Sequence, residues 1–257
     1  MPSVAPPVRY LFGPGPTQVE ARVYDAMAKP VVGYLDPYFF EVSNEIRRGL
    51  RSVYGTENQA TFAVPGTGSS GMETAVSNFV NAGERFLVFN NGFFSDLRET
   101  GTLPEESPMR FVNGGFQMDF DDFERRISLD THLFILCNPQ NPTGNCWSPE
   151  DLLRIGEICL KHRVVVLADE IHCDLVYPGN GHIPFATLNA EVAARTITLN
   201  SATKSFNIPA LRCAVMHFGG AAMRQRFDAR IPSRLLGSPA VTGVDATVAA
   251  WDEGQPW

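Results

Sequence analysis

Short runs of β-branched and aromatic residues alternate with longer amphipathic runs from residue 61 onward, and this alternation constrains the fold more than any other feature. It is typical of strand–helix–strand crossover units, which build a mainly parallel sheet with helices on both faces. We therefore predict an α/β fold with a seven-stranded sheet. The expected strands are Thr61–Val64, Arg85–Asn90, Met109–Val112, His132–Cys137, Arg163–Ala168, Arg195–Asn200 and Arg212–Phe218. The expected helices after residue 61 are Ser69–Val80, Asp119–Ile127, Ser148–His162, Ala221–Ile231 and one from about Pro239 towards Asp252.

The chain before the first strand has a different character. Residues 1–16 are rich in proline and glycine, which favours an extended N-terminal arm over a helix or a central strand. Two amphipathic helices are expected next, from Thr17 to about Lys29 and from Asp36 to about Tyr54. Residues 101–107 and 178–184 are rich in turn-forming residues, but no domain boundary is evident, so residues 17–257 are expected to form one large domain.

Composition excludes several classes of protein. The 257 residues are 44% hydrophobic, which excludes a disordered chain, and their net charge of -7 excludes a basic surface for nucleic acid. No export signal precedes the arm and no run approaches about 18 apolar residues, so neither a leader nor a membrane partner is expected. The five cysteines form no C-x-x-C pair, which favours a reduced, cytoplasmic protein.

A glycine-rich turn follows the first expected strand and opens a helix. Its sequence, Gly66-Thr67-Gly68-Ser69-Ser70-Gly71, matches G-x-G-x-x-G, so the free N–H groups of the helix could bind a phosphate. A dinucleotide site also needs an acidic residue after the next strand, where this chain has Asn90-Asn91. A mononucleotide, another phosphorylated cofactor and a turn that serves only close packing all remain open.

Two further groups follow expected strands. Asn138-Pro139-Gln140-Asn141-Pro142-Thr143-Gly144 could aim an amide at a ligand, or could form only a turn. Asp169-Glu170-Ile171-His172 places a carboxylate at the end of the most apolar strand, where it is a ligand candidate or a turn cap.

Lys204 is the best candidate for an amine nucleophile. It lies in Ser201-Ala202-Thr203-Lys204-Ser205-Phe206-Asn207, after a strand and among small residues, with Arg212 eight positions later. The other two lysines, Lys29 and Lys161, lie near helix ends and suit a solvated role. The four strand-end groups thus supply a phosphate site, an amide, a carboxylate, an amine and an arginine. Pyridoxal 5'-phosphate uses each of these groups.

These motifs resemble the fold type I pyridoxal-phosphate enzymes of the aminotransferase superfamily. Residues of about 11–97, with Gly13-Pro14-Gly15-Pro16, Gly33-Tyr34-Leu35-Asp36-Pro37 and Gly66-Thr67-Gly68-Ser69, resemble class V alanine–glyoxylate and serine–pyruvate aminotransferases. Residues of about 110–257, with the Asn141, Asp169 and Lys204 motifs, resemble class I/II carbon–sulfur lyases related to cystathionine β-lyase. The mixture suggests a recombined or designed chain joined near residues 101–107.

The resemblance assigns roles to residues of this chain. It implies that Lys204 binds the cofactor covalently and shuttles a proton, that Asp169 pairs with the ring nitrogen, and that Asn141, supported by His172, contacts the phenolic oxygen. Phe94 would stack on the ring. The phosphate would be held by Thr67, Gly68, Ser69, Ser201 and Arg212.

The resemblance also implies an aminotransferase-like large domain and a homodimer that acts on a small amino acid. A smaller C-terminal domain, which usually supplies the arginine for the substrate carboxylate, is expected to be missing. We expect a carbon–sulfur β-lyase that yields pyruvate, ammonia and a thiol. An aminotransferase is the alternative, a truncated or chimeric scaffold without catalysis is the rival from another class, and a nucleotide-binding oxidoreductase is a third possibility.

Overall fold

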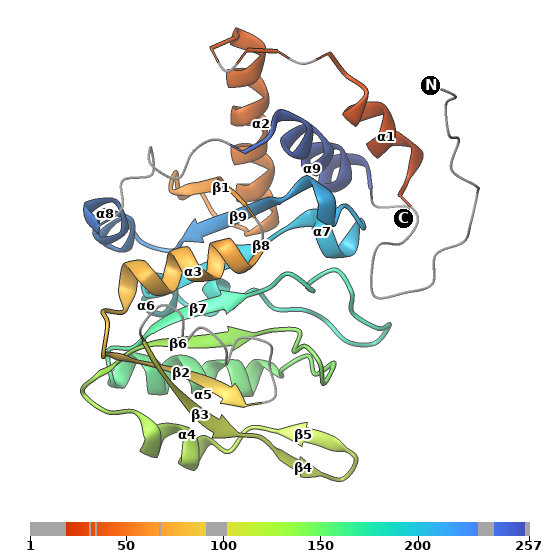
Figure 1. Cartoon of the computed structure of the whole chain (residues 1–257). Coiled ribbons are helices and arrows are strands. Elements are labelled where there is room, and N and C mark those ends of the chain that lie inside the picture. The colour runs from red at the N-terminus through yellow and green to blue at the C-terminus, as the bar shows by residue number, and fades with distance from the viewer. Residues whose placement is uncertain are drawn as a thin grey trace, which may run out of the picture.

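The computed structural model describes residues 19–30, 32–33, 35–66, 68–90, 102–230 and 239–254 (Figure 1). The expected arm at residues 1–16 lies outside these ranges. Among the described residues, no helix is both long enough and apolar enough to cross a membrane. The longer helices are α1 (Ala21–Met27), α2 (Pro37–Val53), α3 (Gly68–Phe79), α4 (Phe120–Arg126), α5 (Pro149–Lys161), α8 (Ala221–Arg230) and α9 (Val241–Glu253). Two four-residue helices are α6 (Ala190–Ala193) and α7 (Ala202–Ser205), and Phe185–Thr187 and Pro209–Leu211 form 3₁₀ turns.

A mixed seven-stranded sheet forms the centre of the molecule. Its order is β1 (Thr61–Pro65), β9 (Cys213–Phe218), β8 (Thr196–Asn200), β7 (Val165–Asp169), β6 (Thr131–Cys137), β2 (Arg85–Asn90) and β3 (Leu103–Pro108). The pairs from β8 to β3 are parallel, whereas β9 runs antiparallel to both of its neighbours. The predicted α/β fold with a mainly parallel seven-stranded sheet is therefore confirmed.

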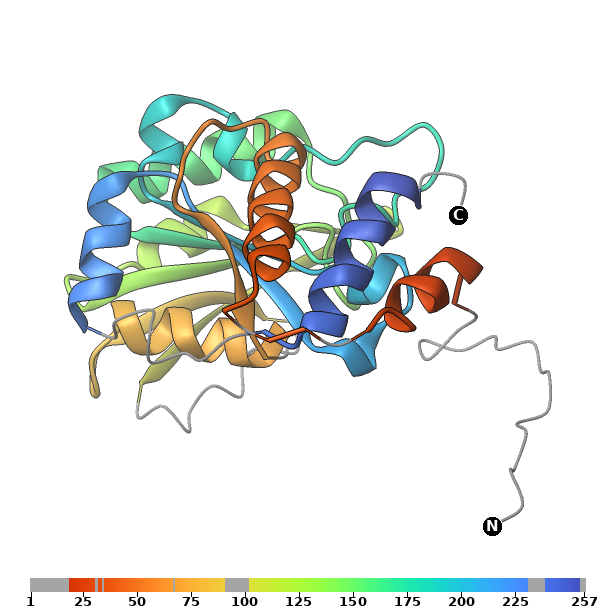
Figure 2. The ribbon, with the colours of Figure 1, turned by 90° about the horizontal axis from the view of Figure 1, so that it is seen from above.

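Helices cover both faces of this sheet, as predicted. Figure 2 shows α3 on one side and α5 on the other. The α3 side packs Val76, Phe79 and Phe227 against alternate strand residues, and the α5 side packs Leu152 and Ile155 in the same way. Because β6, β7 and β8 are covered on both faces, nearly all of their side chains are buried, which explains the apolar runs within β6 and β7.

The expected helix boundaries agree with local capping chemistry. The Asp36 side chain accepts a hydrogen bond from the Tyr38 N–H at 2.8 Å and begins α2. The Ser148 hydroxyl accepts one from the Asp151 N–H at 3.1 Å and begins α5. Each cap satisfies an N–H group that the first helical turn leaves unpaired. The helix predicted from Thr17 is described only as α1, which begins at Ala21.

One strand assignment from the sequence was wrong. Residues 103–108, expected as part of a turn-rich stretch, form the edge strand β3. Residues Met109–Val112, expected in the sheet, instead contribute β4 (Arg110–Val112), which pairs only with β5 (Gly115–Gln117). This hairpin projects beyond the sheet in Figure 1. The Asn113–Gly114 turn explains it, since both residues have positive φ values, 52° and 82°, as a tight hairpin turn requires.

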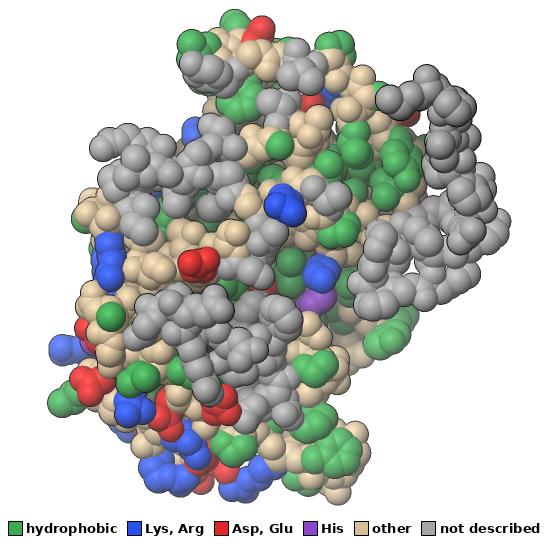
Figure 3. Space-filling view, in the orientation of Figure 1, with side chains coloured by type: hydrophobic (Ala, Val, Ile, Leu, Met, Phe, Trp, Pro, Cys, Tyr) green, Lys and Arg blue, Asp and Glu red, His purple; other side chains and the backbone are tan. Residues whose placement is uncertain are grey.

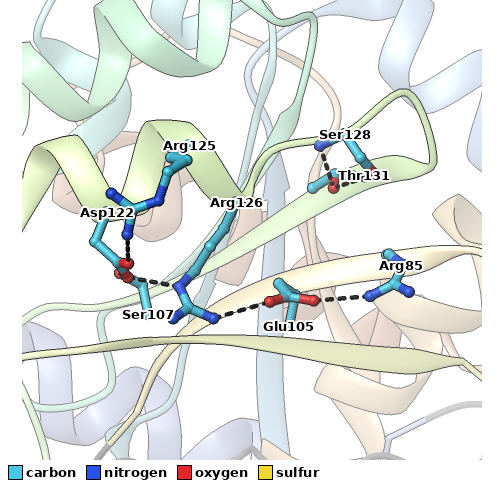
Figure 4. A network of polar contacts seen from close by, with 8 residues as sticks. All are labelled: Arg85, Glu105, Ser107, Asp122, Arg125, Arg126, Ser128 and Thr131. Atoms are coloured by element: carbon cyan, nitrogen blue, oxygen red, sulfur yellow. Dashed lines mark hydrogen bonds and ion pairs between the residues drawn. The ribbon is translucent and has the colours of Figure 1, made fainter.

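A polar network fastens β3 to the molecule (Figure 4). Glu105 accepts hydrogen bonds from Arg85 on β2 at 2.7 Å and from Arg126 on α4 at 2.9 Å. The Asp122 carboxylate accepts hydrogen bonds from the Ser107 hydroxyl at 2.9 Å and from the Arg126 side chain at 2.6 Å. These bonds hold an edge strand that has few apolar side chains of its own.

Candidate active site

One edge of the sheet gathers the segments that the sequence analysis singled out. The carboxyl ends of β6, β7 and β8 meet at this edge, where open α/β sheets bind ligands. Since β9 is antiparallel to β8, its first residues reach the same edge, and β1 also ends there because it is antiparallel to β9. Strand direction alone therefore brings together the glycine-rich turn, the Asn141 loop, the Asp169 segment and the segment from Lys204 to Arg212.

A cavity of about 370 Å³ opens at this edge. In the orientation of Figure 3, a histidine and isolated basic side chains lie near the middle of the molecule, apart from the mixed charges gathered at its lower left. Six of the ten predicted site residues line the cavity: Asn141, Asp169, His172, Ser201, Lys204 and Arg212.

The other predicted residues belong to the glycine-rich turn or follow β2 in the sequence. Thr67 and Phe94 lie outside the described residues, and Gly68 and Ser69 form the start of α3. Their neighbours Gly66 and Gly71 line the cavity. The N-terminus of α3 therefore faces the same space as Lys204, as a phosphate site would require.

Asp169 is the last residue of β7 and is only 6% exposed. Its Oδ1 accepts the Ile171 N–H at 3.2 Å, and its carbonyl oxygen accepts the Asn138 N–H at 3.0 Å. Burial raises the pKa of the Asp169 carboxyl to about 6, although the Ile171 N–H and the Lys204 charge oppose this shift. A buried carboxylate of this kind is suited to binding a cationic ligand atom.

Hydrogen bonds from Trp147 stabilise the loop that carries Asn141. The Trp147 indole N–H donates to the Cys137 carbonyl at 3.2 Å, and the Trp147 backbone N–H donates to Asn138 Oδ1 at 3.2 Å. A bond from the Gly144 N–H to the Gln140 carbonyl closes the loop at 2.8 Å. Both Asn–Pro peptide bonds of this loop are cis. The loop presents the exposed Asn141 to the cavity.

Lys204 extends from the short helix α7. The Ser201 hydroxyl accepts the Thr203 N–H at 3.2 Å and donates to the Cys213 carbonyl at 2.6 Å, so it caps α7 and ties it to β9. Phe206 and Ile208, which follow α7, are buried in one apolar cluster with Ala246 and Ala250 of α9. Lys204 itself is exposed and lines the cavity. The core therefore anchors the helix while the amine faces the open space.

Arg212 adopts a left-handed conformation, with φ of 47°, directly before β9. Its carbonyl accepts the Gly66 N–H at 3.2 Å, which joins the glycine-rich turn to the β9 end. Gly66 has a φ of 135°, and a Cβ there would lie 2.8 Å from Ser70 Cβ, so glycine is required. The backbone thus brings the arginine beside the α3 N-terminus.

Several residues that the sequence analysis did not select also shape this site. Cys137, Asn200 and Met72 line the cavity. Burial and the Asp169 charge raise the pKa of the Cys137 thiol to about 12, so this side chain forms a neutral wall. Cys137 and Asn200 end strands and Met72 lies in α3, so the sequence could place them near this edge of the sheet. Only the structure shows that they line the cavity.

Glu170 is a further residue whose role the sequence did not reveal. It is 1% exposed, and its carboxylate accepts the Phe185 N–H at 2.8 Å and contacts His182 Nε2 at 3.2 Å. These contacts join the end of β7 to the segment that contains His182 and Phe185. Burial and the Lys204 charge lower the pKa of His172, which favours a neutral imidazole.

Comparison with known families agrees with this geometry. The family model described as aminotransferase class I and II matches residues 16–244. The chain belongs to this family. The fold type I resemblance is therefore confirmed, and pyridoxal 5'-phosphate is the cofactor of the family's enzymes. The matched range includes the expected join at residues 101–107.

Individual relatives include both groups that the sequence resembled. Cystathionine beta-lyase PatB of Bacillus subtilis is 37% identical over 190 residues, which are 72% of this chain and 49% of that protein. Alanine–glyoxylate aminotransferase of Drosophila melanogaster is 26% identical over 64% of this chain and 42% of that protein. The chain therefore spans about half the length of these relatives.

A solved structure shares both fold and part of the sequence. The PLP-bound C-S lyase from Staphylococcus hominis has a TM-score of 0.80 and 25% identity, over 94% of this chain and 64% of that chain. The aminotransferase family fold thus extends over nearly all of this chain.

Proposed function

We propose that this chain is part of a pyridoxal-phosphate-dependent carbon–sulfur β-lyase that releases pyruvate, ammonia and a thiol from an amino acid. The observation that supports it is the convergence of Lys204, Asp169, Asn141 and Arg212 on one cavity. Lyases and aminotransferases both use such a set, so the cavity supports the cofactor more strongly than the reaction.

The residues of the cavity fit the cofactor by their chemistry. Lys204 offers an amine for an aldehyde, and the buried Asp169, whose pKa is raised by burial, offers a carboxylate for a protonated ring nitrogen. Arg212 and the N-terminus of α3 offer donors for a phosphate. Ser201 lines the same cavity, but its hydroxyl donates to the Cys213 carbonyl in this structure. Asn141 offers an amide to the phenolic oxygen.

Pyridoxal phosphate, when bound, supplies an electron sink that acidifies the hydrogen on Cα of an amino acid. The Lys204 amine, which lines the cavity, would be the base that takes this proton. Asp169 would keep a proton on the ring nitrogen, and Arg212 and the N-terminus of α3 would hold the phosphate end. Cys137 and Met72 contribute neutral walls that limit access of water.

The choice of a lyase is supported by the relatives. The identity to the B. subtilis cystathionine beta-lyase is 37% over 72% of this chain, against 26% over 64% for the aminotransferase. We propose amino-group transfer to a keto acid as the second candidate, on the evidence of the latter match. We further propose that residues 17–257 form the large domain of a cytoplasmic homodimer, and that the roles of Thr67, Gly68, Ser69, Phe94 and His172 follow the family pattern.

Spectroscopy and product analysis test this proposal. Added pyridoxal phosphate should give the parent a visible band of lysine-bound cofactor, and Lys204→Ala should abolish it. Lys161→Ala is the matched control, since Lys161 is exposed and pairs with Glu124 on the surface. Pyruvate and thiol release from cystathionine, with the band present, supports the lyase.

The other results would contradict parts of the proposal. Keto acid formation only in the presence of a second keto acid would establish the aminotransferase instead. A bound cofactor with neither product would favour the non-catalytic scaffold. No band in the parent would contradict the cofactor site itself.

A further inference from the structure

The Asn200 side chain joins two segments that carry candidate site residues. Asn200 is the last residue of β8 and is 4% exposed. Its Oδ1 accepts the Ser201 N–H at 2.7 Å, and its Nδ2 donates to the Cys173 thiol at 3.2 Å. Ser201 caps α7, which carries Lys204, whereas Cys173 lies in the turn after β7. One amide therefore contacts both the start of α7 and the turn that carries His172.

This contact extends the link between β7 and β8 beyond their paired ends. The register of the two strands ends at Asp169 and Leu199, and the Glu170 N–H then donates to the Leu199 carbonyl at 2.9 Å. The Cys173 N–H donates back to the Glu170 carbonyl at 3.0 Å, which closes a turn, while the chain after β8 enters α7. The bond from Asn200 to Cys173 thus connects the two segments after their backbones have separated.

Tyr54, the residue that follows α2, packs beside this pair. It is 4% exposed, and its ring stacks on His217 of β9 with the ring centroids 5.3 Å apart. Burial raises the pKa of the Tyr54 hydroxyl, Glu170 and Cys173 raise it further, and the Asn200 side chain lowers it. These interactions place the hydroxyl near both members of the pair. An Asn200 amide that lost its acceptor in this buried position would carry a desolvation cost.

We propose that the Asn200–Cys173 pair positions the Lys204 amine, with Asn200 as the positioning residue and the Cys173 thiol as the acceptor that fixes it. This inference rests on the proposed function, because it takes Lys204 as the base of that reaction. Cys173 is not one of the described residues that line the cavity, whereas Asn200 is. The influence of the thiol on Lys204 therefore passes through Asn200 and the Ser201 N–H that Asn200 holds.

Hydrogen–deuterium exchange of the full chain without cofactor tests the pair directly. Cys173→Ala removes the acceptor and should speed exchange of the α7 backbone amides about fivefold, the effect of one hydrogen bond. Cys173→Ser keeps an acceptor and should restore the exchange rate of the parent. Cys159→Ala is the matched control, because it removes the same atom from a buried cysteine of α5 that is not among the described residues lining the cavity.

Kinetics of the pyridoxal-phosphate-loaded chain give a second readout. Cys173→Ala should lower kcat about fivefold and change KM less than about twofold, because the pair acts on the base rather than on substrate binding. A double-mutant cycle tests the route of the effect. In an Asn200→Ala background, Cys173→Ala should change kcat by less than about twofold.

Two results would overturn the proposal: α7 exchange in Cys173→Ala equal to that in Cys159→Ala, or an equal kcat loss from Cys173→Ala in the parent and Asn200→Ala backgrounds. Failure of the proposed function is a separate outcome, because exchange needs neither cofactor nor turnover. If the parent releases no keto acid, the rate at which the visible band of lysine-bound cofactor forms replaces kcat. The proposal then stands if Cys173→Ala slows band formation about fivefold relative to Cys159→Ala, and is wrong if the two variants are equal.

Discussion

Replacing Asp169 by asparagine is expected to stabilise the cofactor-free chain while removing its catalytic activity. Asp169 is 6% exposed, and burial raises the pKa of its carboxyl from 3.8 to about 6. At neutral pH the fold therefore holds an ionised group in a place that favours the neutral acid. A shift of about two pKa units corresponds to roughly 3 kcal/mol.

The sign of the pH dependence follows from proton binding. The folded chain binds this proton more tightly than the unfolded chain, so the associated stability is present below pH 3.8 and is lost as the pH rises through about 6. Asparagine is neutral throughout this range and its oxygen can still accept the Ile171 N–H. The variant should therefore exceed the parent in unfolding free energy by about 3 kcal/mol at pH 7.5, by about half as much at pH 5, and by little near pH 3.5.

Urea unfolding of the parent and the variant at these three pH values measures the difference directly. Subtracting the two curves at each pH cancels the contributions of all other carboxylates. Asp130→Asn, at an exposed position, is the control and should show no such trend. A variant that is less stable than the parent at pH 7.5, or a difference that stays constant from pH 3.5 to 7.5, would refute the reasoning. With pyridoxal phosphate added, the variant should release almost no keto acid, since an amide does not keep the ring nitrogen protonated.

Three further substitutions test how the fold supports the site. Trp147→Phe removes the indole bond to the Cys137 carbonyl and should cost about 1 kcal/mol in urea unfolding and weaken pyridoxal phosphate binding; unchanged binding would mean that the Asn141 loop needs no such support. Glu105→Gln should lower the free energy of urea unfolding by about 1 kcal/mol, because it weakens both arginine contacts. Added salt should reduce this difference from the parent. Gly243→Ala would place a Cβ 2.5 Å from the Leu211 carbonyl oxygen, so a loss of about 1–3 kcal/mol is expected in thermal unfolding; equal stability would contradict the tight approach of α9.

The sequence predicted those strands whose burial on both faces determines their residue types. Strands β6 and β7 contain apolar runs and β8 is rich in β-branched residues, so the positions of all three were predicted to within two residues. The edge strand β3 was missed because Leu103–Pro108 contains two prolines and two glutamates. Proline is tolerated in an edge strand, and Glu105 forms ion pairs with Arg85 and Arg126, distant residues that a local pattern does not reveal.

The candidate site was predictable where its residues end strands. Asp169 and Lys204 were selected because they follow strands of a presumed parallel sheet, and the structure brings both to one cavity. The antiparallel direction of β9 was not predicted, although it explains why Arg212 precedes a strand rather than following one. Glu170 was not selected because its partners, His182 and Phe185, lie 12 and 15 residues away in the sequence.

The pairing of β1 with β9 has a consequence for synthesis on the ribosome. This pairing joins Thr61 to His217, so the first strand emerges long before the neighbour that completes its hydrogen bonds. Contacts between such distant residues form slowly, because a long loop must close first. The glycine-rich turn after β1 meets Arg212 only after that closure. Cofactor capture is therefore expected after translation of nearly the whole described chain, and nascent chains that end before β9 should leave β1 unpaired and open to chaperones.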